Sequence, residues 1–591
     1  MKEMKNEESK DPHEDSGFLR NLLVGDEEKK RFKTTSGIEL KLVYVPDDLK
    51  ETDYNRDIGN PGEYPYTRGI YPGMYRVVPW RGGHAAGFEG ISESMERMDE
   101  YARTGSILGF VDGAQAAYEA GLFRAVSFYD DTPGHWGIGS DNPMVEYQVG
   151  TTGAAMDSIE DFKQILDKFP PEVQMIYFHW PHQGIGAPIL FAMNIAAIEE
   201  ANFPKDMVMG THGNDPIGSR LGFRVQVLPI EAELKIATDL LEYCINNLPR
   251  WTAIGVGGFN MRGSGMNGIQ EAGICLAAGI TYMEYGRERG LNVDKVASQI
   301  TFFMASSLDF FEEVAKFRAA RRVWARILRE EFGVKNPRSM QFRVNVQTWN
   351  TELTAQQPQN NIVRATIQGL AAILGGAQSI VFTPYDEALG LPTTEAVLQA
   401  DNTNAILREE CGLIGTVDPI GGSYCIEALT NEIDRRVVDY LDMVRDMGKD
   451  GSMKSGIITG INNGYFLSEM ARNVAKREKA INSGEKLVVG RNKYVREEKR
   501  KLSIFKTSPD YYQRRKEELK KLRETRDKRK VEEALQKLHK AAENGENVIS
   551  QLVESAKARI TMEEAADVFR DVYGVSKLWI GRDLYRPRVI E

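Results

Sequence analysis

The stretch ITFFMASSLDFFEEVAKFRAARRVWARILREEFGVKNPRSMQFRVNV, residues 300–346, decides the fold. It begins with one β-prone run, Ile300 to Met304, and ends with another, Phe342 to Val346. Between them, Asp309 to Phe332 repeats apolar residues at three- and four-residue steps, and Gly333 follows as a C-terminal stop. A strand, a helix and a second strand in this order predict a parallel pair joined by a helical crossover.

The same alternation extends on both sides of this stretch. Five further β-prone runs are separated by helix-length patterns: Ala125 to Phe128, Met175 to Phe178, Met207 to Met209, Ala253 to Val256 and Ser379 to Phe382. Seven runs favour a closed (β/α)8 barrel, a TIM barrel, over an open sheet. We expect this α/β domain to span residues 61–445, and the pattern does not place the eighth strand.

The flanking segments have different compositions. Residues 1–60 begin as a charged tail and predict an N-terminal arm that orders only against another surface. Residues 446–591 are predicted to form a C-terminal helical segment. Within it, residues 493–540 are rich in Lys, Arg and Glu, which is typical of a solvated helical face.

Composition excludes several functional classes. The 591 residues are 42% hydrophobic and carry a net charge of -10, which predicts a globular protein without the basic surface that binds nucleic acid. The N-terminus lacks the apolar core of a signal peptide, and no stretch is apolar for long enough to cross a bilayer. We therefore expect a cytoplasmic protein that binds neither nucleic acid nor membrane. Four widely separated cysteines predict no disulfide framework and no thiolate zinc site.

Polar residues follow the apolar runs, where a barrel places its active site. Four of them are histidines: His135, His179, His182 and His212. With neighbouring aspartates they could assemble a metal site, but no closely paired motif such as HExxH is present. We therefore predict hydrogen-bonding and packing roles around a pocket, and no metal ligands.

Long contiguous segments of this sequence resemble one family. They are YTRGIYPGMYR (66–76), SDNP (140–143), FFEEVAKFRAARR (310–322), KNPRSM (335–340), LTAQQ (353–357), NNIVR (360–364) and VDPIGGSY (417–424). All resemble the large subunit of methylmalonyl-CoA mutase and its relatives. A weaker match continues through GRNKY (490–494), so the resemblance covers most of the chain.

The resemblance implies a radical isomerase. In this family the tail of the acyl-CoA threads the barrel axis, adenosylcobalamin caps one end, and the protein directs a vicinal carbon-skeleton rearrangement. The family holds cobalamin largely through a separate domain with a DxHxxG motif, which we do not find here. Asp11-Pro12-His13 begins like that motif, but Ser16 stands at its glycine position. The resemblance therefore implies a hetero-oligomer with a small cobalamin-binding subunit.

Several residues occupy positions of family contacts. By resemblance, Tyr71 lies beside the CoA chain, His135 near the corrin face, Lys316 in the active-site region and Gln347 beside the substrate, while Gln368 replaces a glutamate directed toward the adenosyl ribose. The predicted catalytic residues are Asn260, His212, Lys316 and Gln347. The predicted substrate-binding residues are Tyr71, Arg81, Ala85, Gly213, Phe223, Arg224 and Asn345. The predicted cofactor-binding residues are His135, Gly222, Gln368 and Gly369.

Other positions depart from the family pattern near the CoA end. Val78 and Gly83 stand where methylmalonyl-CoA mutase has arginines toward the CoA phosphates, and Arg81 could replace one lost charge. Ala85 stands where the family has a tyrosine that steers the radical. The smaller side chain predicts room for a larger acyl group.

The predicted acyl pocket departs further. Gly213 replaces a glutamine that approaches the thioester, and Phe223 replaces the arginine that pairs with the substrate carboxylate. Asn260 replaces a histidine; its amide can donate to the thioester carbonyl but cannot act as an acid. We therefore expect an acyl group that is bulkier or less polar than methylmalonyl. A carboxylate remains an option if Arg220 or Arg224 approaches the pocket.

Two other functions are consistent with the residues. One is a TIM-barrel enzyme of another class, using Asp130, His135, His179, His182 and His212 for acid-base or metal-assisted chemistry. The other is a non-catalytic mutase relative that assembles with the cobalamin-binding subunit.

Overall fold

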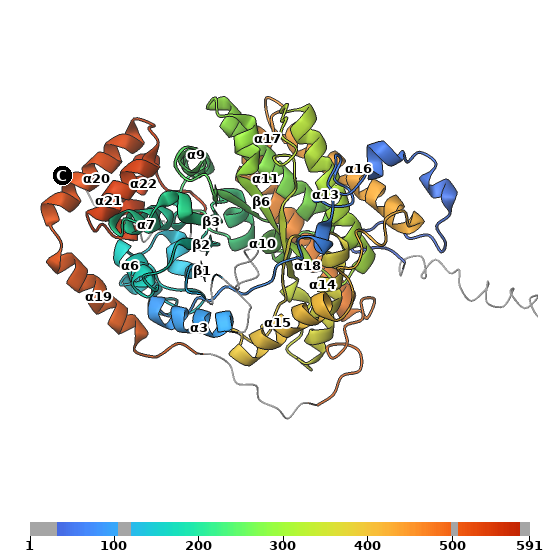
Figure 1. The fold of residues 1–591 in the computed structure, drawn as a ribbon, viewed down its shortest axis with the longest axis horizontal. Coiled ribbons are helices and arrows are strands. Elements are labelled where there is room, and N and C mark those ends of the chain that lie inside the picture. Colours follow the sequence, from blue (N-terminus) through green and yellow to red (C-terminus); the bar gives the residue numbers. More distant parts are fainter. Residues whose placement is uncertain (1–31, 104–116, 118–119, 498–505, 580–591) are drawn as a thin grey trace, which may run out of the picture.

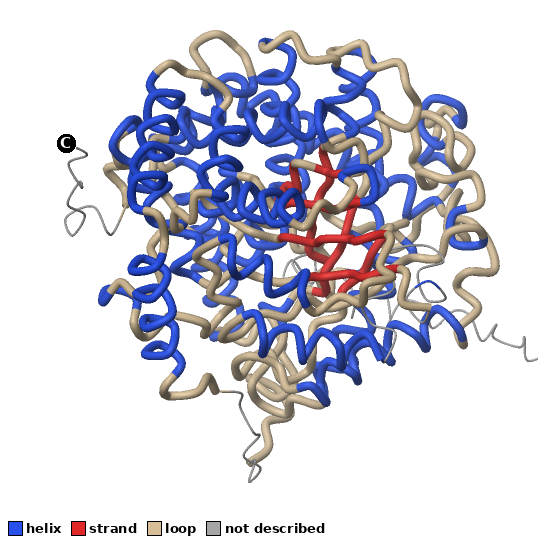
Figure 2. Tube along the Cα trace, turned by 60° about the vertical axis from the view of Figure 1, so that its left-hand side comes forward, coloured by secondary structure: helices blue, strands red, loops and turns tan. Residues whose placement is uncertain are grey.

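The computed structural model describes residues 32–103, 117, 120–497 and 506–579, and it has an α/β fold. Its named strands form two four-stranded parallel sheets, in the orders β1-β2-β3-β4 and β5-β6-β7-β8. The strands are β1 Phe123–Ser127, β2 Met175–Trp180, β3 Val208–His212, β4 Trp251–Thr252, β5 Ile254–Gly257, β6 Ile300–Ser306, β7 Val344–Thr348 and β8 Ser379–Val381. Figure 2 shows the strands in the interior, surrounded by helices.

All seven predicted strands are confirmed, with ends that shift by a few residues. The run predicted from Ala253 to Val256 corresponds to β5, and the short strand β4 comes just before it. Only Ala253 separates the two strands. Because β4 pairs with β3 and β5 pairs with β6, the chain itself connects the two sheets at this point.

A further extended segment, residues 81–86, lies between β8 and β1. The backbone carbonyl of Arg81 accepts a hydrogen bond from the backbone nitrogen of Ile380 (2.8 Å). The backbone nitrogen of Ala86 donates one to the carbonyl of Ser127 (2.9 Å). Both contacts are parallel bridges. The sequence pattern did not reveal this segment because it is glycine-rich, whereas recognisable strands are rich in β-branched and aromatic residues.

Helices follow the strands in order. They are α5 Thr132–Trp136 and α6 Ile159–Asp167 after β1; α7 Gly186–Glu200 after β2; α8 Pro216–Gly218 and α9 Ile230–Asn247 after β3; α10 Gly258–Gly263, α11 Gly268–Glu288 and α12 Val293–Ser298 after β5; α13 Phe310–Glu330 after β6; α14 Asn360–Leu374 after β7; and α15 Thr394–Glu409 after β8. The helix predicted from Asp309 to Phe332 is confirmed as α13. Helix α3, Ile91–Arg103, precedes β1.

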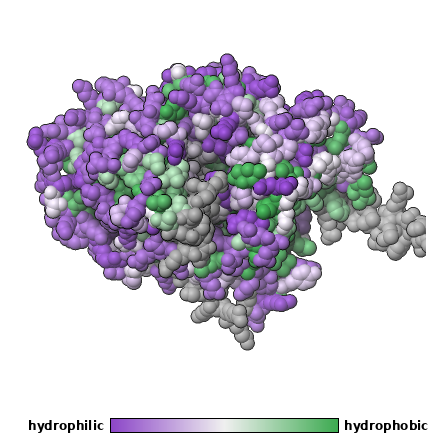
Figure 3. All heavy atoms as spheres, viewed as in Figure 1, coloured by the Kyte–Doolittle hydropathy of each residue, from purple (hydrophilic) through white to green (hydrophobic). Residues whose placement is uncertain are grey.

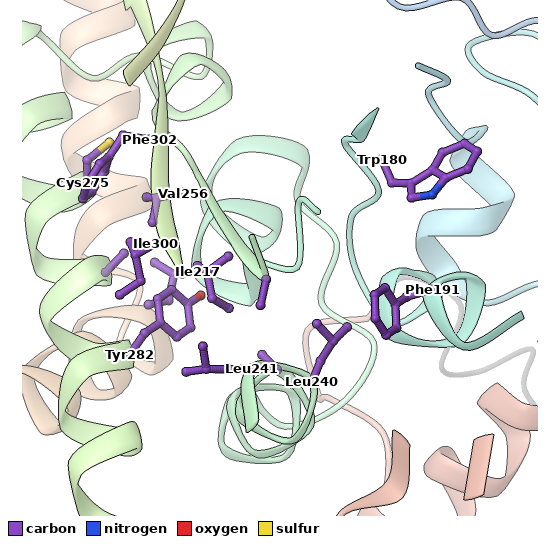
Figure 4. Packing of buried hydrophobic residues seen from close by; sticks show 14 of the residues in the cluster. Trp180, Phe191, Ile217, Leu240, Leu241, Val256, Cys275, Tyr282, Ile300 and Phe302 are labelled. Carbon is purple, nitrogen blue, oxygen red and sulfur yellow. The ribbon is translucent and has the colours of Figure 1, made fainter. Parts of the chain in front are cut away.

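One face of each strand packs against the helices. In β2 the buried residues alternate with half-buried ones, as expected for a strand whose two faces differ. On the helix-facing side, the ring of Phe302 lies 5.1 Å from that of Trp324 on α13 and 4.2 Å from that of Phe342. Figure 4 shows buried side chains of strands and helices meeting in this layer. The main hydrophobic core is therefore outside the strands.

From residue 424 onward, the described part of the chain consists mostly of helices. Its helices are α16 Tyr424–Met447, α17 Met453–Asn462, α18 Tyr465–Asn482, α19 Tyr511–Thr525, α20 Lys528–Glu543, α21 Val548–Lys557 and α22 Met562–Tyr573. Helix α7 is buried on all sides from Gly186 to Ile198, because α21 and α22 pack against it (Figure 1). The predicted boundary at residue 445 lies in the last turn of α16, which packs on α11 and α13.

Residues 32–60, the described part of the predicted N-terminal arm, lie against helices of the same chain. The backbone nitrogen and hydroxyl of Ser36 donate to Glu312 on α13 (2.9 and 2.8 Å). The amide of Asn431 on α16 donates to the hydroxyl of Thr52 (2.9 Å). Short turns of this region and of the loops are η1 Pro46–Leu49, η2 Tyr54–Ile58, η3 Met74–Arg76, η5 Pro143–Val145, η6 Lys205–Met207, η7 Ser219–Phe223 and η8 Asn350–Glu352.

The visible surface is mostly hydrophilic, with hydrophobic side chains in small separate groups (Figure 3). Among the described residues, no helix combines the length and the apolar character that crossing a bilayer needs.

Candidate active site

A cavity of about 1290 Å³ lies among the strands. The residues that alternate with the helix-facing ones contribute much of its wall: Tyr177 and His179 of β2, Thr211 of β3, Gly255 and Gly257 of β5, Thr301 and Phe303 of β6, Asn345 and Gln347 of β7, and Ser379 and Val381 of β8. Most of these side chains are polar or absent. The inner face of the strands therefore encloses open space, while the outer face forms the core.

The cavity extends along the length of the strands. At their N-terminal end it is lined by Arg343 and Gln378, which immediately precede β7 and β8, and by Tyr71 and Tyr75 from the loop before residue 81. Arg343 donates to the carbonyl of Ile300 (3.1 Å), and burial lowers its pKa. At the C-terminal end the wall includes residues that follow β1, β2, β3, β5 and β8. The cavity is thus a channel between the two ends.

Asp130 and His135 face each other at the C-terminal end. Imidazole Nε2 of His135 lies 3.2 Å from Oδ1 of Asp130. Burial opposes the charged form of this imidazole, but the Asp130 carboxylate outweighs burial and raises the pKa of His135. The ring of Phe223, which is 38% exposed, meets the His135 ring edge-on at 5.2 Å. Oδ2 of Asp130 has no hydrogen-bond partner in the described part of the chain.

His179 is the histidine whose side chain belongs to the channel face of its strand. Its Nδ1 lies 2.7 Å from the hydroxyl of Ser127. Burial and then the neighbouring His182 lower the pKa of His179 to about 4, so its imidazole is neutral near pH 7. His179 is not among the residues predicted from the sequence to be catalytic. Strand alternation places His179 on the same face as Tyr177, but the sequence does not show which face of the strand lines the channel.

His212, which was predicted to be catalytic, borders the cavity but directs its imidazole toward α7. Nε2 donates to the carbonyl of Ala187 (2.9 Å), and the ring lies 5.4 Å from both Phe191 and His182. Burial lowers the pKa of His212 well below its ordinary value. Because Thr211 faces the channel, the next residue in the strand must face the helices. These contacts favour a packing role.

Three amide side chains lie along the channel. Asn260 is on α10, directly after β5, and Gln347 donates from Nε2 to the hydroxyl of Thr383 (3.4 Å). Oδ1 of Asn345 has no partner among the residues that the structure describes. The structure therefore brings together three of the predicted residues as potential hydrogen-bonding groups.

Lys316 is fully buried outside the cavity wall defined by the described residues. Its Nζ donates to Glu271 (2.7 Å) and to the carbonyl of Ala305 (2.7 Å), and it also pairs with Glu313. Arg262 completes the network through Glu313 (3.0 Å). The cost of burying the ammonium group is thus offset by carboxylate partners.

Three of the predicted substrate-binding residues line the channel near residues 81–86 or after β3: the cation Arg81 and the small residues Ala85 and Gly213. A side chain at Gly213 has no space, because an added Cβ would lie 2.3 Å from the carbonyl oxygen of His182. The glutamine that the resemblance places here therefore does not fit this loop conformation.

Four other predicted residues lie behind the cavity wall defined by the described residues: Gly222, Arg224, Gln368 and Gly369. Gly222 packs against Asn260, where an added Cβ would lie 2.6 Å from the asparagine Cβ. Arg224 has Nη2 3.7 Å from the sulfur of Met470, and burial lowers its pKa. Gln368 donates to Glu352 (3.1 Å).

Glu387 lines the cavity but is not among the site residues predicted from the sequence, although it lies shortly after β8. Burial raises its pKa. Asn350 donates from Nδ2 to its Oε1 (2.9 Å). As for metals, no group of three or more His, Cys, Asp or Glu side chains in the described ranges could hold a metal ion.

Comparison with known proteins identifies the family. The family model described as methylmalonyl-CoA mutase matches residues 33–575, which is nearly the whole chain. The chain belongs to the methylmalonyl-CoA mutase family. Relatives in this family catalyse intramolecular group transfer, so the chain is an isomerase of the acyl-CoA mutase type.

Relatives of this methylmalonyl-CoA mutase family member differ in how much of their length aligns. The probable mitochondrial methylmalonyl-CoA mutase of Caenorhabditis elegans is 34% identical over 92% of this chain and 69% of its own length. The human mitochondrial methylmalonyl-CoA mutase is 33% identical, with the same shares. The 2-hydroxyisobutanoyl-CoA mutase large subunit of Aquincola tertiaricarbonis is 33% identical over 94% of each chain.

Proposed function

We propose that this chain is the large subunit of an adenosylcobalamin-dependent acyl-CoA mutase whose acyl substrate is bulkier or less polar than methylmalonyl. The observation that carries the proposal is the open channel with Phe223 and Ala85 at its C-terminal end. The matched length of a relative named as a large subunit supports the subunit assignment.

The proposed architecture is one closed (β/α)8 barrel over residues 61–445, with an N-terminal arm (1–60) and a C-terminal helical part (446–591). Closure is supported by the continuity of β4 with β5 and by the bonds of residues 81–86 to both β8 and β1. Bulky branched side chains usually fill such a barrel. Here residues such as Thr301 and Ser379 leave the axis open.

The channel suits a long acyl-CoA. Its volume of about 1290 Å³ exceeds the range of roughly 300–1,000 Å³ that is typical of small-molecule pockets. Arg81 and Arg343 place positive charge on the wall, and Tyr71 adds a ring beside them. We propose that these residues bind and orient the CoA portion, so that the acyl thioester lies at the C-terminal end.

The C-terminal end fits a large flat cofactor, because the half-exposed Phe223 ring and the His135 imidazole stand there together. Adenosylcobalamin, which this family uses, supplies the radical that removes and later returns a substrate hydrogen. We propose that His135 contacts the cofactor. Gly222 packs against Asn260 near this end, while Gln368 and Gly369 on α14 support the wall beside β7 and β8. The Asp11-Pro12-His13 segment lies outside the described residues, and a separate small subunit is proposed to bind the cofactor.

Asn260 is proposed to hold the thioester. Its amide donates to the carbonyl oxygen and leaves no acid at this position, so the group is oriented without proton transfer. We propose that Gln347 and Asn345 add polar contacts along the same wall. His179, which is neutral and on the channel face, replaces His212 as the proposed histidine beside the substrate.

The decisive experiment combines the full chain, a matching small subunit and adenosylcobalamin, and screens branched, aromatic and dicarboxylic acyl-CoA esters for product and for a change in cobalamin absorbance. Turnover of an ester larger than methylmalonyl-CoA is expected. Absence of both signals for every ester would refute the proposal.

The double variant Phe223→Arg with Ala85→Tyr should shift substrate preference toward methylmalonyl-CoA. An unchanged preference would show that these residues do not define the acyl pocket.

A further inference from the structure

Tyr129 is a large side chain on the channel wall that the proposed function does not use. It comes two residues after β1 ends, and part of its side chain is exposed in the cavity that it lines. Val126 and Phe128 are buried in the core between strands and helices, so the alternate residues Ser127 and Tyr129 face the channel. The ring of Tyr129 is therefore part of the C-terminal end of the channel.

The register of the neighbouring segments places Tyr129 in one layer of the wall. Its backbone nitrogen donates to the carbonyl of Ala86 (2.9 Å), and this parallel bridge sets Gly87 beside Tyr129. On the other side, the register of β1, β2 and β3 continues past the last pairs and brings Pro181 and then Gly213 into the same layer. All four residues line the cavity.

Tyr129 is the large side chain of this four-residue layer. Gly87 and Gly213 have none, and neither position has room for one. An added Cβ would lie 2.7 Å from the carbonyl oxygen of Tyr129 in the first case and 2.3 Å from that of His182 in the second. Pro181 contributes only a compact ring. On this side of the channel, the width of the layer therefore depends on the phenol ring.

The layer nearer the N-terminal end of the strands has a small residue instead. The same bridge sets Ala85 beside Ser127, two residues before Gly87 and Tyr129. Two residues of extended chain span about 6.6 Å, which is close to the length of a tyrosine side chain. The space beside Ala85 thus lies at the side of the channel, one layer before the ring.

The ring is a neutral wall. Burial and then the Glu387 carboxylate raise the pKa of Tyr129 to about 12, so the phenol is uncharged at pH 7. The face of a neutral aromatic ring packs against hydrocarbon. Extra methylene groups forced against a packed side chain are destabilising, so the ring also sets a limit to what it can contact.

We propose that Tyr129 is a specificity-determining residue whose ring limits the length of the acyl chain. This inference rests on the proposed function, which places the acyl thioester at this end of the channel. An acyl chain that extends along the channel meets the ring, whereas added bulk nearer the thioester lies beside Ala85. The two residues therefore define different dimensions of the acyl pocket.

Calorimetric binding of straight-chain acyl-CoA esters, from butyryl to decanoyl, to the full chain tests the proposal. In the wild type, affinity should rise about 4-fold for each added methylene until the chain reaches the ring, and then stop rising. Tyr129→Ala should extend this rise by two or three methylenes, so it should bind the first esters beyond the wild-type limit about 15- to 60-fold more tightly than the wild type does.

Two further variants isolate the ring. Tyr129→Phe keeps the ring and should keep the wild-type limit. Tyr147→Ala makes the same substitution as Tyr129→Ala at a tyrosine that is 91% exposed, so it should reproduce the wild-type series. An equal shift of the limit in Tyr129→Phe and Tyr129→Ala would overturn the role of the ring.

The outcomes separate the two proposals. A wild-type affinity that rises throughout the series, or an unchanged limit in Tyr129→Ala, would overturn the role of Tyr129 and leave the mutase proposal standing. Failure of the wild type to bind any ester would reject acyl-CoA as its ligand, and the role of Tyr129 would fall with it. If Tyr129→Ala does not fold, the shorter side chain of Tyr129→Leu decides: a limit moved to longer esters supports the proposal, and an unmoved limit rejects it.

Discussion

Replacing Lys316 with methionine should destabilise the fold while the channel wall stays intact. The ammonium group is fully buried and has two carboxylate partners, Glu271 and Glu313, and a carbonyl acceptor. Methionine has a similar length but no charge, so the two carboxylates lose a shared cation. Removing one partner from a buried ion pair costs about 3–5 kcal/mol. Arg262 still pairs with Glu313, which leaves Glu271 as the principal uncompensated carboxylate.

A second substitution isolates the ionic contribution. Lys316→Met with Glu271→Gln removes both charges, and the glutamine oxygen can still accept the bond that Ala305 donates to Glu271 (2.6 Å). The double variant should therefore recover much of the lost stability. Lys520→Met, at an exposed lysine on α19, is the control and should change the unfolding free energy by less than about 0.5 kcal/mol.

The stability loss should depend on pH. Burial would raise the pKa of Glu313, but Lys316 and then Arg262 outweigh it and lower that pKa. A carboxyl group with a lowered folded-state pKa contributes stability above its unfolded pKa, about 4.3, and loses it as the pH falls through the folded value. Without Lys316, Glu313 accepts a proton at higher pH, so the gap between wild type and variant should be widest near pH 7 and should narrow on acidification.

Guanidinium denaturation followed by tryptophan fluorescence measures these effects, because Trp324 is buried on the same helix. Midpoints should be compared for wild type, single, double and control variants at pH 5.5 and pH 7.5. A Lys316→Met denaturation midpoint equal to that of wild type, together with lost turnover, would refute the structural role and support the predicted catalytic role of Lys316.

Three further substitutions test other parts of the structure. Burial would lower the pKa of His84, but the Asp401 carboxylate raises it, so the pair adds stability below about pH 6.5 that is lost as the pH rises through the folded-state pKa. Asp401→Asn should remove this pH dependence from denaturation midpoints measured from pH 6 to 9. An unchanged pH profile would contradict the pairing. Gly213→Ala should cost about 1–3 kcal/mol in unfolding free energy because its Cβ would meet a carbonyl oxygen at 2.3 Å, and a wild-type denaturation midpoint would show that the loop adjusts freely. Gly369→Ala would place Cβ 2.2 Å from the ring of Phe382, so a similar loss is expected in thermal melts, and Phe382→Leu should rescue it; absence of rescue would argue against a steric cause.

Local patterns in the sequence determined most of the framework. Each strand run and the helix from Phe310 to Glu330 could be predicted, because periodic burial leaves its mark on consecutive residues. Long matching segments also identified the family, since contiguous identity over many residues is far more specific than a short motif. The resemblance that these segments establish also pointed to Asn260 and Gln347, which lie outside the segments, as residues near the site, and both line the channel.

The three-dimensional arrangement decided what those patterns left open. Whether a strand-end histidine faces inward depends on a shift of one residue, and only the fold shows that His179 faces the channel while His212 packs on α7. Contacts between residues distant in sequence decided the rest: residues 81–86 pair with strands at both ends, and Lys316 meets Glu271 across two helices. Sequence periodicity reports the surroundings of each element along the chain, whereas these pairings arise only when distant elements meet.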